Sequence, residues 1–266
     1  MSSGRKIRLV DLLVERGLCD DAALAKRLVI AGEVRGENGV LTQPSLLLDP
    51  GIEITLTGTS RFVSRGGDKL YGALEDFAFD VSGLKCLDVG ASTGGFTDCL
   101  LKAGATGVVA VDVAYGQFAW QLRNDARITL LERTSIRAVD PTEVGAPFDL
   151  VVADVSFSPL RSLFPVLAGF VEAGGFLITL IKPQFELPAG AVGKNGVVSD
   201  SELHEKAIIQ VLEAATANDL APIALTYSGL KGPKGNREFF LMAQRSGIPA
   251  NITVEQVVRD AHRALV

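Results

Sequence analysis

Several kinds of residue are scarce in this 266-residue chain, and each scarcity excludes a class of protein. The three cysteines, Cys19, Cys86 and Cys99, are odd in number and form no C-x-x-C pair. We therefore expect reduced thiols rather than a disulfide framework or a cysteine-based zinc site. The two histidines, His204 and His262, are too few for a histidine-based metal centre, so no metal ion is expected.

The chain also lacks long apolar runs. No segment approaches the roughly 18–20 apolar residues that a bilayer-spanning helix needs, and the polar N-terminal stretch is not typical of a signal peptide. With 47% hydrophobic and 21% charged residues, the composition is that of an ordinary folded globular protein. We therefore expect a cytoplasmic, monomeric protein without a membrane partner.

A surplus of positive charge, the usual mark of a nucleic-acid binder, is missing as well, because the net charge is −5. A chain that is acidic overall can still bind nucleic acid where basic residues gather on one face. The basic groups along the sequence are Arg5, Lys6 and Arg8; Arg61, Arg65 and Lys69; and Lys231, Lys234 and Arg237. Each group is either a contact with RNA or solvated surface.

Residues 1–59 are a candidate small domain. The apolar face of a first short helix would consist of Leu9, Leu12 and Leu13. Asp20 or Asp21 can begin a second helix, which continues to Ile30. Short strand-like pieces follow around Val34, Val40–Leu41 and Ile52–Leu56. The sequence therefore predicts two helices followed by a small curled sheet.

This arrangement resembles the S-four-type RNA-binding domain, a small α+β module. The resemblance implies that the basic residues of the domain and of the segment after it contact RNA, namely Arg5, Lys6, Arg8, Lys26, Arg27, Arg61 and Arg65. Members of that family usually carry basic residues where this chain has Cys19-Asp20-Asp21. Fewer phosphate contacts are therefore expected from the second helix. The alternative is a helical cap without a role in RNA binding.

We expect residues 60–66 to form a linker and residues 67–266 a large domain. Apolar strands alternate with helical patterns there, which predicts a mostly parallel, Rossmann-like α/β sheet of seven strands with helices on both faces. The predicted strands are Lys85–Val89, Gly107–Asp112, Ile128–Leu131, Leu150–Asp154, Phe176–Ile181, Ala224–Ser228 and Phe239–Ala243. The predicted helices include Gly95–Ala103, Tyr115–Leu122, Leu160–Phe170 and Ser201–Ala217.

Two local signals refine this picture. Ser199 with Glu202, and Thr253 with Gln256, have the spacing of a capping box, which predicts where the last two helices begin. The only tryptophan, Trp120, lies in the predicted second helix of the large domain, where we expect it to pack in the core.

A glycine-rich turn follows the first predicted strand, with the pattern Asp88-x-Gly90-x-x-x-Gly94-Gly95. A strand, a glycine-rich turn and a helix together present backbone amides to a ligand, and glycine lets the backbone approach that ligand closely. Asp112 ends the second strand, where an acid can accept both hydroxyls of a ribose. The spacing differs from G-x-G-x-x-G, but a dinucleotide-binding dehydrogenase and glycines that serve only tight packing remain alternatives.

The turn resembles motif I of the class I S-adenosylmethionine (SAM) methyltransferases. The resemblance implies a class I fold with SAM as the cofactor, and the segment Glu132-Arg133-Thr134-Ser135 could frame the adenine ring. The expected cofactor-binding residues are Asp88, Gly90, Ala91, Ser92, Thr93, Gly94, Gly95, Phe96, Asp112, Val113, Arg133, Thr134, Ser135 and Asp154.

Four charged residues stand in distinctive settings far apart in the chain: Lys69, Asp154, Lys182 and Glu238. Asp154 and Lys182 end predicted strands, so both should lie at the carboxyl edge of the sheet, where ligands bind in open α/β folds. Each of the four taken alone could be part of a structural salt bridge. Their order, Lys-Asp-Lys-Glu, resembles the tetrad of the FtsJ/RrmJ-type ribose 2′-O-methyltransferases.

The chemistry implied by that resemblance accounts for the residue types. The enzyme must align a ribose hydroxyl with the methyl group and remove one proton. A lysine can accept a proton only if burial or a neighbouring cation lowers its pKa, and Lys69 beside Lys182 would supply that cation. By resemblance, Lys182 accepts or steers the proton, Asp154 and Lys69 position the hydroxyl, and Glu238 supports them.

The whole chain resembles the TlyA family of rRNA cytidine 2′-O-methyltransferases, often labelled haemolysins. The segments that carry the resemblance are Gly-Ala-Ser-Thr-Gly-Gly-Phe-Thr at 90–97, Tyr-Gly-Gln at 115–117, Leu-Arg-Asn-Asp at 122–125, Val-Ala-Asp-x-Ser-Phe at 152–157 and Lys-Pro-Gln-Phe-Glu at 182–186. It implies rRNA in ribosomal subunits, not DNA, as the partner. The linker departs from the family, because Arg61-Phe62-Val63 stands where a tryptophan is common. The same chemistry on tRNA, a catalytically silent RNA binder and a membrane-lytic protein are the alternatives.

Overall fold

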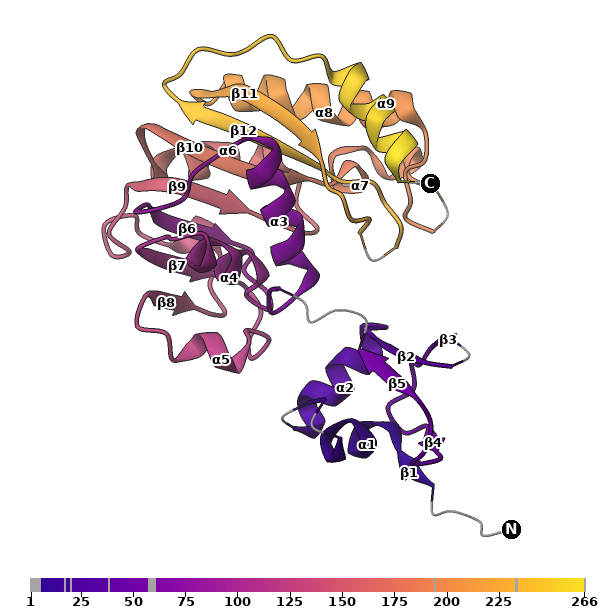
Figure 1. The fold of residues 1–266 in the computed structure, drawn as a ribbon. Coiled ribbons are helices and arrows are strands. Elements are labelled where there is room, and N and C mark those ends of the chain that lie inside the picture. Colours follow the sequence, from indigo (N-terminus) through magenta and orange to yellow (C-terminus); the bar gives the residue numbers. More distant parts are fainter. Residues whose placement is uncertain are drawn as a thin grey trace. The chain divides into compact units, whose positions relative to one another are not determined.

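The computed structural model of the chain describes residues 6–16, 18–19, 21–37, 39–56, 61–193, 195–232 and 234–265. The chain divides into two compact units, Met1–Arg61 and Phe62–Val266 (Figure 1). Residues 62–66, which we expected to be part of a linker, belong to the large unit. Phe62 is only 4% exposed, and the Val63 amide donates a hydrogen bond of 2.9 Å to Asp98 Oδ2.

The described residues of the small unit form two short helices and two small antiparallel sheets, in which β1 pairs with β4 and β2 pairs with β3 and β5. The elements are β1 (Ile7–Arg8), α1 (Leu9–Glu15), α2 (Ala22–Ile30), β2 (Val34–Gly36), β3 (Gly39–Val40), β4 (Leu47–Leu48) and β5 (Ile54–Leu56). Asp21 begins α2 as predicted, because its Oδ1 accepts the Leu24 amide at 2.7 Å. Leu9, Leu13 and Val29 are fully buried in one core that joins the helices to the sheets.

The described part of the large unit is built on a seven-stranded sheet in the order β11-β12-β10-β9-β6-β7-β8. Strand β12 runs antiparallel to β10 and β11, and the other neighbouring pairs are parallel. The predicted mostly parallel α/β sheet is therefore confirmed. The strands are β6 (Lys85–Val89), β7 (Gly107–Val111), β8 (Ile128–Leu131), β9 (Phe148–Ala153), β10 (Val171–Ile181), β11 (Leu220–Tyr227) and β12 (Phe239–Arg245).

Helices and short helical turns connect these strands. The α-helices are α3 (Arg65–Asp76), α4 (Gly95–Lys102), α5 (Trp120–Arg123), α6 (Phe164–Leu167), α7 (Pro183–Glu186), α8 (Ser201–Thr216) and α9 (Val254–Ala264). The 3₁₀ turns are Ile136–Ala138, Leu160–Ser162, Ala168–Phe170 and Ala189–Ala191.

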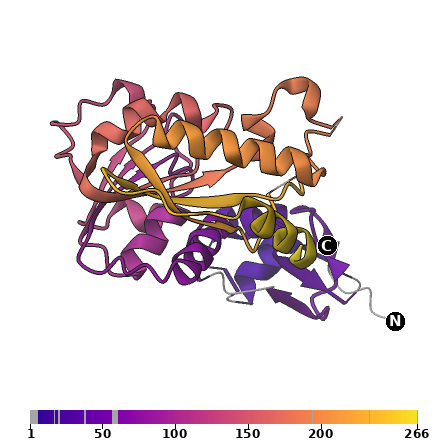
Figure 2. The same ribbon diagram turned by 90° about the horizontal axis from the view of Figure 1, so that it is seen from above.

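Side chains of the central strands alternate between two cores, because successive residues of a strand point to opposite faces of the sheet. Leu150 and Val152 of β9 pack with residues of α3 and α4, whereas Val151 and Ala153 pack with residues of α6, α8 and α9. Figure 2 shows α8 on one side of the sheet and α3 and α4 on the other. The apolar runs of the sequence thus become strands that are buried on both faces.

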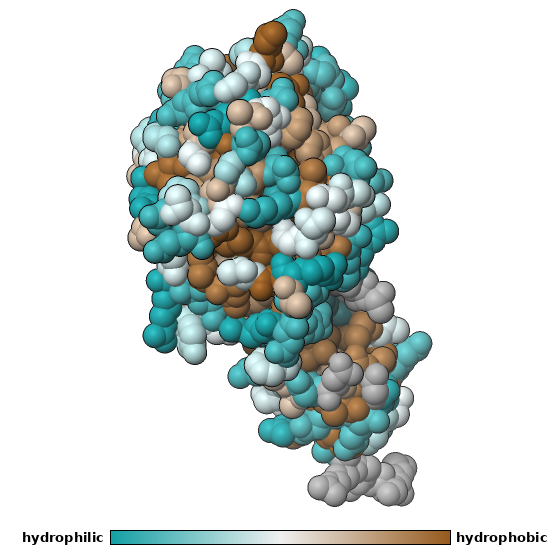
Figure 3. All heavy atoms as spheres, turned by 90° about the vertical axis from the view of Figure 1, so that its left-hand side faces the viewer, coloured by the Kyte–Doolittle hydropathy of each residue, from teal (hydrophilic) through white to brown (hydrophobic). Residues whose placement is uncertain are grey.

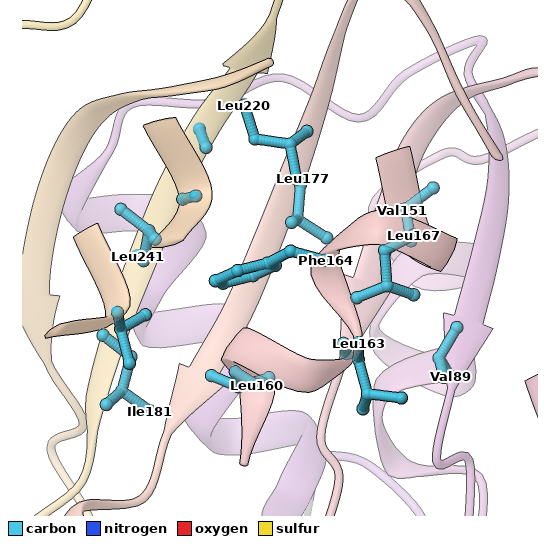
Figure 4. Packing of buried hydrophobic residues seen from close by; sticks show 14 of the residues in the cluster. Val89, Val151, Leu160, Leu163, Phe164, Leu167, Leu177, Ile181, Leu220 and Leu241 are labelled. Carbon is cyan, nitrogen blue, oxygen red and sulfur yellow. The ribbon is translucent and has the colours of Figure 1, made fainter. Parts of the chain in front are cut away.

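Phe164 of α6 lies at the centre of the core on the α8 side. Figure 4 shows its ring among Leu160, Leu163 and Leu177. The Phe164 side chain is fully buried, and truncation of such a residue to alanine typically costs about 3–5 kcal/mol of unfolding free energy. This core supports the segments that follow β9 and β10, which carry the charged residues considered below.

Three sequence expectations about helices are wrong. The helix predicted over Leu160–Phe170 is divided into the 3₁₀ turn Leu160–Ser162, the four-residue α6 and the 3₁₀ turn Ala168–Phe170. The helix predicted over Tyr115–Leu122 is only the short α5, and Trp120 at its start is 75% exposed rather than packed in the core. A four-residue helix has no continuous apolar face to bury that side chain. The side chain that caps α8 belongs to Asp200 instead of Ser199, since Asp200 Oδ1 accepts the Glu202 amide at 2.9 Å.

Several large apolar side chains of the large unit reach the surface, namely Val113, Tyr115, Trp120, Phe157, Ile209, Leu230 and Ile248. Figure 3 shows on one face how hydrophobic residues lie among hydrophilic ones. Within the residues that the structure describes, no helix has the length and apolar character needed to cross a membrane.

Candidate active site

Strand pairing brings three of the four charged residues to one edge of the sheet. Ala153 of β9 pairs with Val89 of β6 and with Thr179 of β10. Asp154 therefore follows β9 at its carboxyl end, and Lys182 follows the last residue of β10. Strand β12 runs in the opposite direction, with Phe239 opposite Ile181. Glu238, the residue before β12, is for this reason at the same edge.

Lys69 joins this edge from a helix. It lies on α3, which packs on the face of the sheet that carries Leu150 and Val152, and its ammonium forms an ion pair with Glu238. The side chains of Lys69 and Glu238 are only 8% and 2% exposed. A buried ion pair of this kind is costly to break, because loss of either partner leaves an uncompensated charge out of water.

The other two charged residues form a second ion pair. Lys182 Nζ lies 2.5 Å from Asp154 Oδ1 and donates a hydrogen bond of 3.0 Å to Ser156 Oγ. These side chains are more open, with 12% of Lys182 and 25% of Asp154 exposed. The Lys182 ammonium thus already binds one hydroxyl oxygen beside a carboxylate. The sequence offered a signal for Ser156, since it stands two residues after Asp154, but we had not assigned it to the site.

The structure therefore brings the four residues together as two lysine–acid pairs. The sequence interpretation had placed Lys69 beside Lys182 as a neighbouring cation, whereas each ammonium has a carboxylate as its partner. The two ion pairs suit different tasks. The more exposed pair, Lys182–Asp154, can contact a substrate. The buried pair, Lys69–Glu238, can hold a fixed arrangement of charges at the same edge of the sheet.

The segment after Lys182 holds the loop after Asp154 in place. The ring centroids of Phe185 and Phe157 are 5.4 Å apart, and the Leu160 amide donates a hydrogen bond of 2.8 Å to Glu186 Oε1. Glu186 is 1% exposed, and burial raises the pKa of its carboxyl group. The conspicuous Lys-Pro-Gln-Phe-Glu segment is thus a one-turn helix, α7, which is attached at both ends to the loop that carries Asp154 and Ser156.

Two glycines of the glycine-rich turn have a backbone conformation and close neighbours that both disfavour a side chain. Gly90 and Gly94 have positive φ angles of 86° and 90°, which favour glycine. A Cβ atom at Gly90 would lie 2.5 Å from the carbonyl oxygen of Asp154, and one at Gly94 would lie 2.7 Å from Leu122 Cδ1. These glycines therefore allow close packing of the chain itself, which was one of the alternatives for this turn. That they also let a ligand approach closely stays a prediction.

Asp88 at the end of β6 is completely buried. Its Oδ2 accepts a hydrogen bond of 2.6 Å from Thr97 Oγ1, while Oδ1 has no hydrogen-bond partner among the described residues. Burial, together with the charge of Asp154, raises the pKa of Asp88 to about 7, although the bond from Thr97 opposes the shift. An orphaned carboxyl oxygen at this depth is ready to accept a hydrogen bond from a ligand.

Asp112 organises the neighbouring backbone. Its two carboxyl oxygens accept the amides of Ser92 at 2.6 Å and of Ala114 at 2.7 Å. The side chain is half-buried, and a carboxylate has lone pairs left for further donors. Thus Asp112 joins the end of β7 to the glycine-rich turn and can still bind a hydroxyl group.

The other residues expected at a cofactor divide into exposed and buried groups. Val113 is 72% exposed, and Arg133 lies over the ring of Tyr115 at 4.0 Å from its centroid, with Thr134 and Ser135 next in the chain. The residues of the turn that are buried are Ala91, Gly94, Gly95 and Phe96. Phe96 packs against Phe240, with 6.1 Å between the ring centroids, so its side chain belongs to the core. Ser92 is exposed and Thr93 is half-buried.

These residues fit a nucleoside cofactor such as SAM. The site offers a buried carboxyl oxygen at Asp88, an acid at Asp112, and an apolar surface beside a cation at Val113, Tyr115 and Arg133. These residues lie at the carboxyl ends of the neighbouring strands β6, β7 and β8, and open α/β sheets bind ligands at such an edge. Among the described residues, no three acidic, histidine or cysteine side chains are grouped to hold a metal ion.

The basic residues expected to contact RNA are on the surface where the structure describes them. Lys6, Arg8, Lys26 and Arg27 are exposed in the small unit, and Arg61 and Arg65 are also exposed. Arg8 forms a bidentate pair with Asp11 through hydrogen bonds of 2.6 and 2.9 Å. Arg5 lies outside the described residues.

Comparison of the sequence with known protein families agrees with this geometry. The model of the FtsJ-like methyltransferase family matches residues 62–245, which is more than half of the chain. The large unit is therefore an FtsJ-like methyltransferase, and SAM is its cofactor.

Two curated relatives and one solved structure identify more specifically the family to which the chain belongs. The 16S/23S rRNA (cytidine-2′-O)-methyltransferase TlyA of Mycobacterium tuberculosis is 41% identical over 98% of both chains. The 23S rRNA (cytidine-2′-O)-methyltransferase TlyA of Campylobacter jejuni is 34% identical over 75% of this chain and 77% of its own. A hemolysin-like structure from Streptococcus thermophilus is 36% identical, covers 98% of both chains and has a TM-score of 0.78. This chain belongs to the TlyA family.

Proposed function

We propose that this protein transfers the methyl group of SAM to the ribose 2′-hydroxyl of a cytidine in the RNA of the small ribosomal subunit, the large one or both. The observation that carries the proposal is the pair of lysine–acid contacts, Lys182–Asp154 and Lys69–Glu238, at the same sheet edge as the glycine-rich turn. The relatives named for this reaction support the substrate.

The open pair carries the chemistry in this proposal. SAM supplies an electrophilic methyl group when bound. A ribose hydroxyl is a poor nucleophile, so its proton must be accepted as the new bond forms. Lys182 accepts that proton as a neutral amine and so becomes the ammonium that pairs with Asp154, or as an ammonium it steers the proton to the Asp154 carboxylate. Asp154 also positions the hydroxyl. The hydrogen bond from Lys182 to the Ser156 hydroxyl supports this assignment, because a substrate hydroxyl can take the same kind of contact.

The buried pair has a supporting role. The positive charge of Lys69 helps to position the substrate hydroxyl. Glu238 holds Lys69 in place through their ion pair. A preorganised charge needs no rearrangement when the reaction occurs, which is why enzymes bury such groups beside reacting atoms.

The small unit would deliver the RNA in this proposal. Its exposed residues Lys6, Arg8, Lys26 and Arg27 suit contacts with phosphates, and an RNA substrate would be recognised through its shape and through unpaired nucleotides. The protein would act as a monomer in the cytoplasm, where ribosomal subunits are available, with RNA rather than DNA as its partner.

The test is transfer of labelled methyl from SAM to separated, unmodified small and large ribosomal subunits. We expect label on a cytidine 2′-oxygen and a loss of at least about 100-fold in kcat for Lys182→Ala, in the range found when a proton-transfer group is removed. The matched control is Lys206→Ala, because Lys206 is an exposed lysine on α8. SAM binding without transfer to either subunit would overturn the proposal and direct the search to tRNA.

A further inference from the structure

Several hydrogen bonds from neighbouring segments hold the segment around Glu238 in place. Asn236 is 2% exposed, its Oδ1 accepts the Val198 amide at 2.9 Å, and its Nδ2 donates to the Gly196 carbonyl at 2.8 Å. The Ser228 amide donates a hydrogen bond of 2.8 Å to the Glu238 carbonyl. These hydrogen bonds hold the backbone at Glu238 in position, in addition to the ion pair between its carboxylate and Lys69.

Arg237 connects this segment to the C-terminal helix, α9. Its Nη2 donates a hydrogen bond of 2.6 Å to the Leu265 carbonyl, and its Nε donates one of 3.4 Å to the Ala261 carbonyl. Both carbonyls lie at the end of α9, where the helix dipole favours a cation; the Ala261 carbonyl also accepts the Leu265 amide at 3.1 Å. Arg237 thus caps α9 from the residue directly before Glu238.

The two histidines make a second connection between α9 and this segment. His262 of α9 and His204 of α8 approach through Nε2 and Nδ1 at 2.9 Å, and His204 Nε2 lies 3.0 Å from the Val198 carbonyl. A carbonyl only accepts, so His204 carries its proton on Nε2, and His262 donates from Nε2 to His204 Nδ1. The His204 ring packs against Phe239, with 5.6 Å between centroids. Residues on both sides of Glu238 are thus tied to α9.

We propose that Arg237 is a positioning residue for methyl transfer: by binding the end of α9 it fixes Glu238, and through Glu238 it fixes the ammonium of Lys69. This inference rests on the proposed function for its kinetic consequence, but its structural consequence is independent of activity. Arg237 does not touch substrate or cofactor in the proposal. It acts on the buried ion pair alone, so the glycine-rich turn and SAM binding are unaffected.

The structural consequence is tested by labelling with an amine-reactive acetylating reagent and mass spectrometry of peptides. Lys69 is only 8% exposed in its ion pair, whereas Lys206 is exposed and serves as the internal standard. We expect Arg237→Ala to raise the labelling rate of Lys69 by about tenfold, because local opening exposes the amine. Arg237→Lys, which can reach only one of the two carbonyls, should give a smaller rise. Unchanged labelling of Lys69 in Arg237→Ala would overturn the proposal.

The kinetic consequence is tested with a double-mutant cycle. Arg237→Ala should lower kcat for methyl transfer by about 10- to 100-fold, the range expected for a displacement of about 1 Å at a catalytic group. The affinity for SAM should not change. In a Glu238→Gln background, Arg237→Ala should have almost no further effect, because the residue acts through Glu238.

The matched control is Arg263→Ala, which removes an exposed arginine from the same helix. An equal loss of kcat from Arg237→Ala with and without Glu238 would refute a positioning role. A wild-type protein that transfers no methyl group to any RNA would instead overturn the proposed function. In that case the labelling of Lys69 still decides whether Arg237 holds the buried pair.

Discussion

Replacement of Asp88 by asparagine changes one buried carboxyl group into an amide of the same shape. Thr97 Oγ1 can donate to the amide oxygen as it does to Asp88 Oδ2, so the local hydrogen bond is kept. The change removes the group's ability to ionise. It also places an NH2 group where Asp88 Oδ1 has no hydrogen-bond partner, at a cost that does not depend on pH. The pH dependence of the stability difference therefore isolates the free-energy cost of a buried charge at the end of β6.

The size of that cost follows from the pKa of Asp88, which rises from 3.8 to about 7 on folding. Three pKa units correspond to about 4 kcal/mol of unfolding free energy. Between pH 3.8 and 7 the folded state holds a proton that the unfolded state has lost, so the stability falls as the pH rises. Above pH 7 Asp88 is ionised in both states, and the full destabilisation of about 4 kcal/mol is present.

We therefore expect the stability of Asp88→Asn relative to the wild type to rise by up to about 4 kcal/mol between pH 4 and pH 8. Urea unfolding of both proteins, followed by circular dichroism at the two pH values, measures the difference. A difference that does not depend on pH would refute the reasoning. The cause would then be packing rather than ionisation.

The same variant tests whether Asp88 faces the cofactor. SAM carries positive charge, which favours an ionised carboxylate nearby. The affinity of the wild type for SAM should therefore rise between pH 6 and pH 8, and calorimetric titration at these values measures it. Asp88→Asn should bind SAM more weakly at pH 8 and without this dependence. An identical pH profile for both proteins would place Asp88 outside the cofactor site.

Three further predictions concern the backbone and the histidines. A Cβ at Gly90 would meet the carbonyl of Asp154 in a backbone of positive φ, so Gly90→Ala should cost about 3 kcal/mol of unfolding free energy, measured by urea unfolding. A Cβ at Gly232 would contact Glu238 Oε1, so Gly232→Ala should lower kcat by about tenfold while SAM affinity, measured by calorimetry, stays unchanged. Burial, followed by the charge of His262, lowers the pKa of His204 to about 4. Its contribution of about 3 kcal/mol to the unfolding free energy is therefore complete above pH 6.5 and is lost as the pH falls towards 4. Urea unfolding of His204→Gln beside the wild type should show that this contribution is missing, while those of Asp88 and His262 persist.

The strands were the part of the fold most accessible from the sequence. Lys85–Val89 and Ile128–Leu131 were predicted with the bounds that the structure has. Continuous apolar runs between helical segments can only be buried on both faces of a parallel sheet, so their local pattern carries enough information. The predicted helix at Tyr115 failed because no such pattern continues through it, and Trp120 remained exposed.

The sequence by itself determined that Asp154 and Lys182 stand at the carboxyl edge, because each follows an apolar strand and parallel strands end at the same side. Only the tertiary structure decided that Lys69 pairs with Glu238 and that Lys182 pairs with Asp154. It also decided that Arg237 and the histidines tie α9 to this edge. Contacts between residues far apart in the chain depend on how helices pack on the sheet, and no local pattern of residue types encodes that geometry.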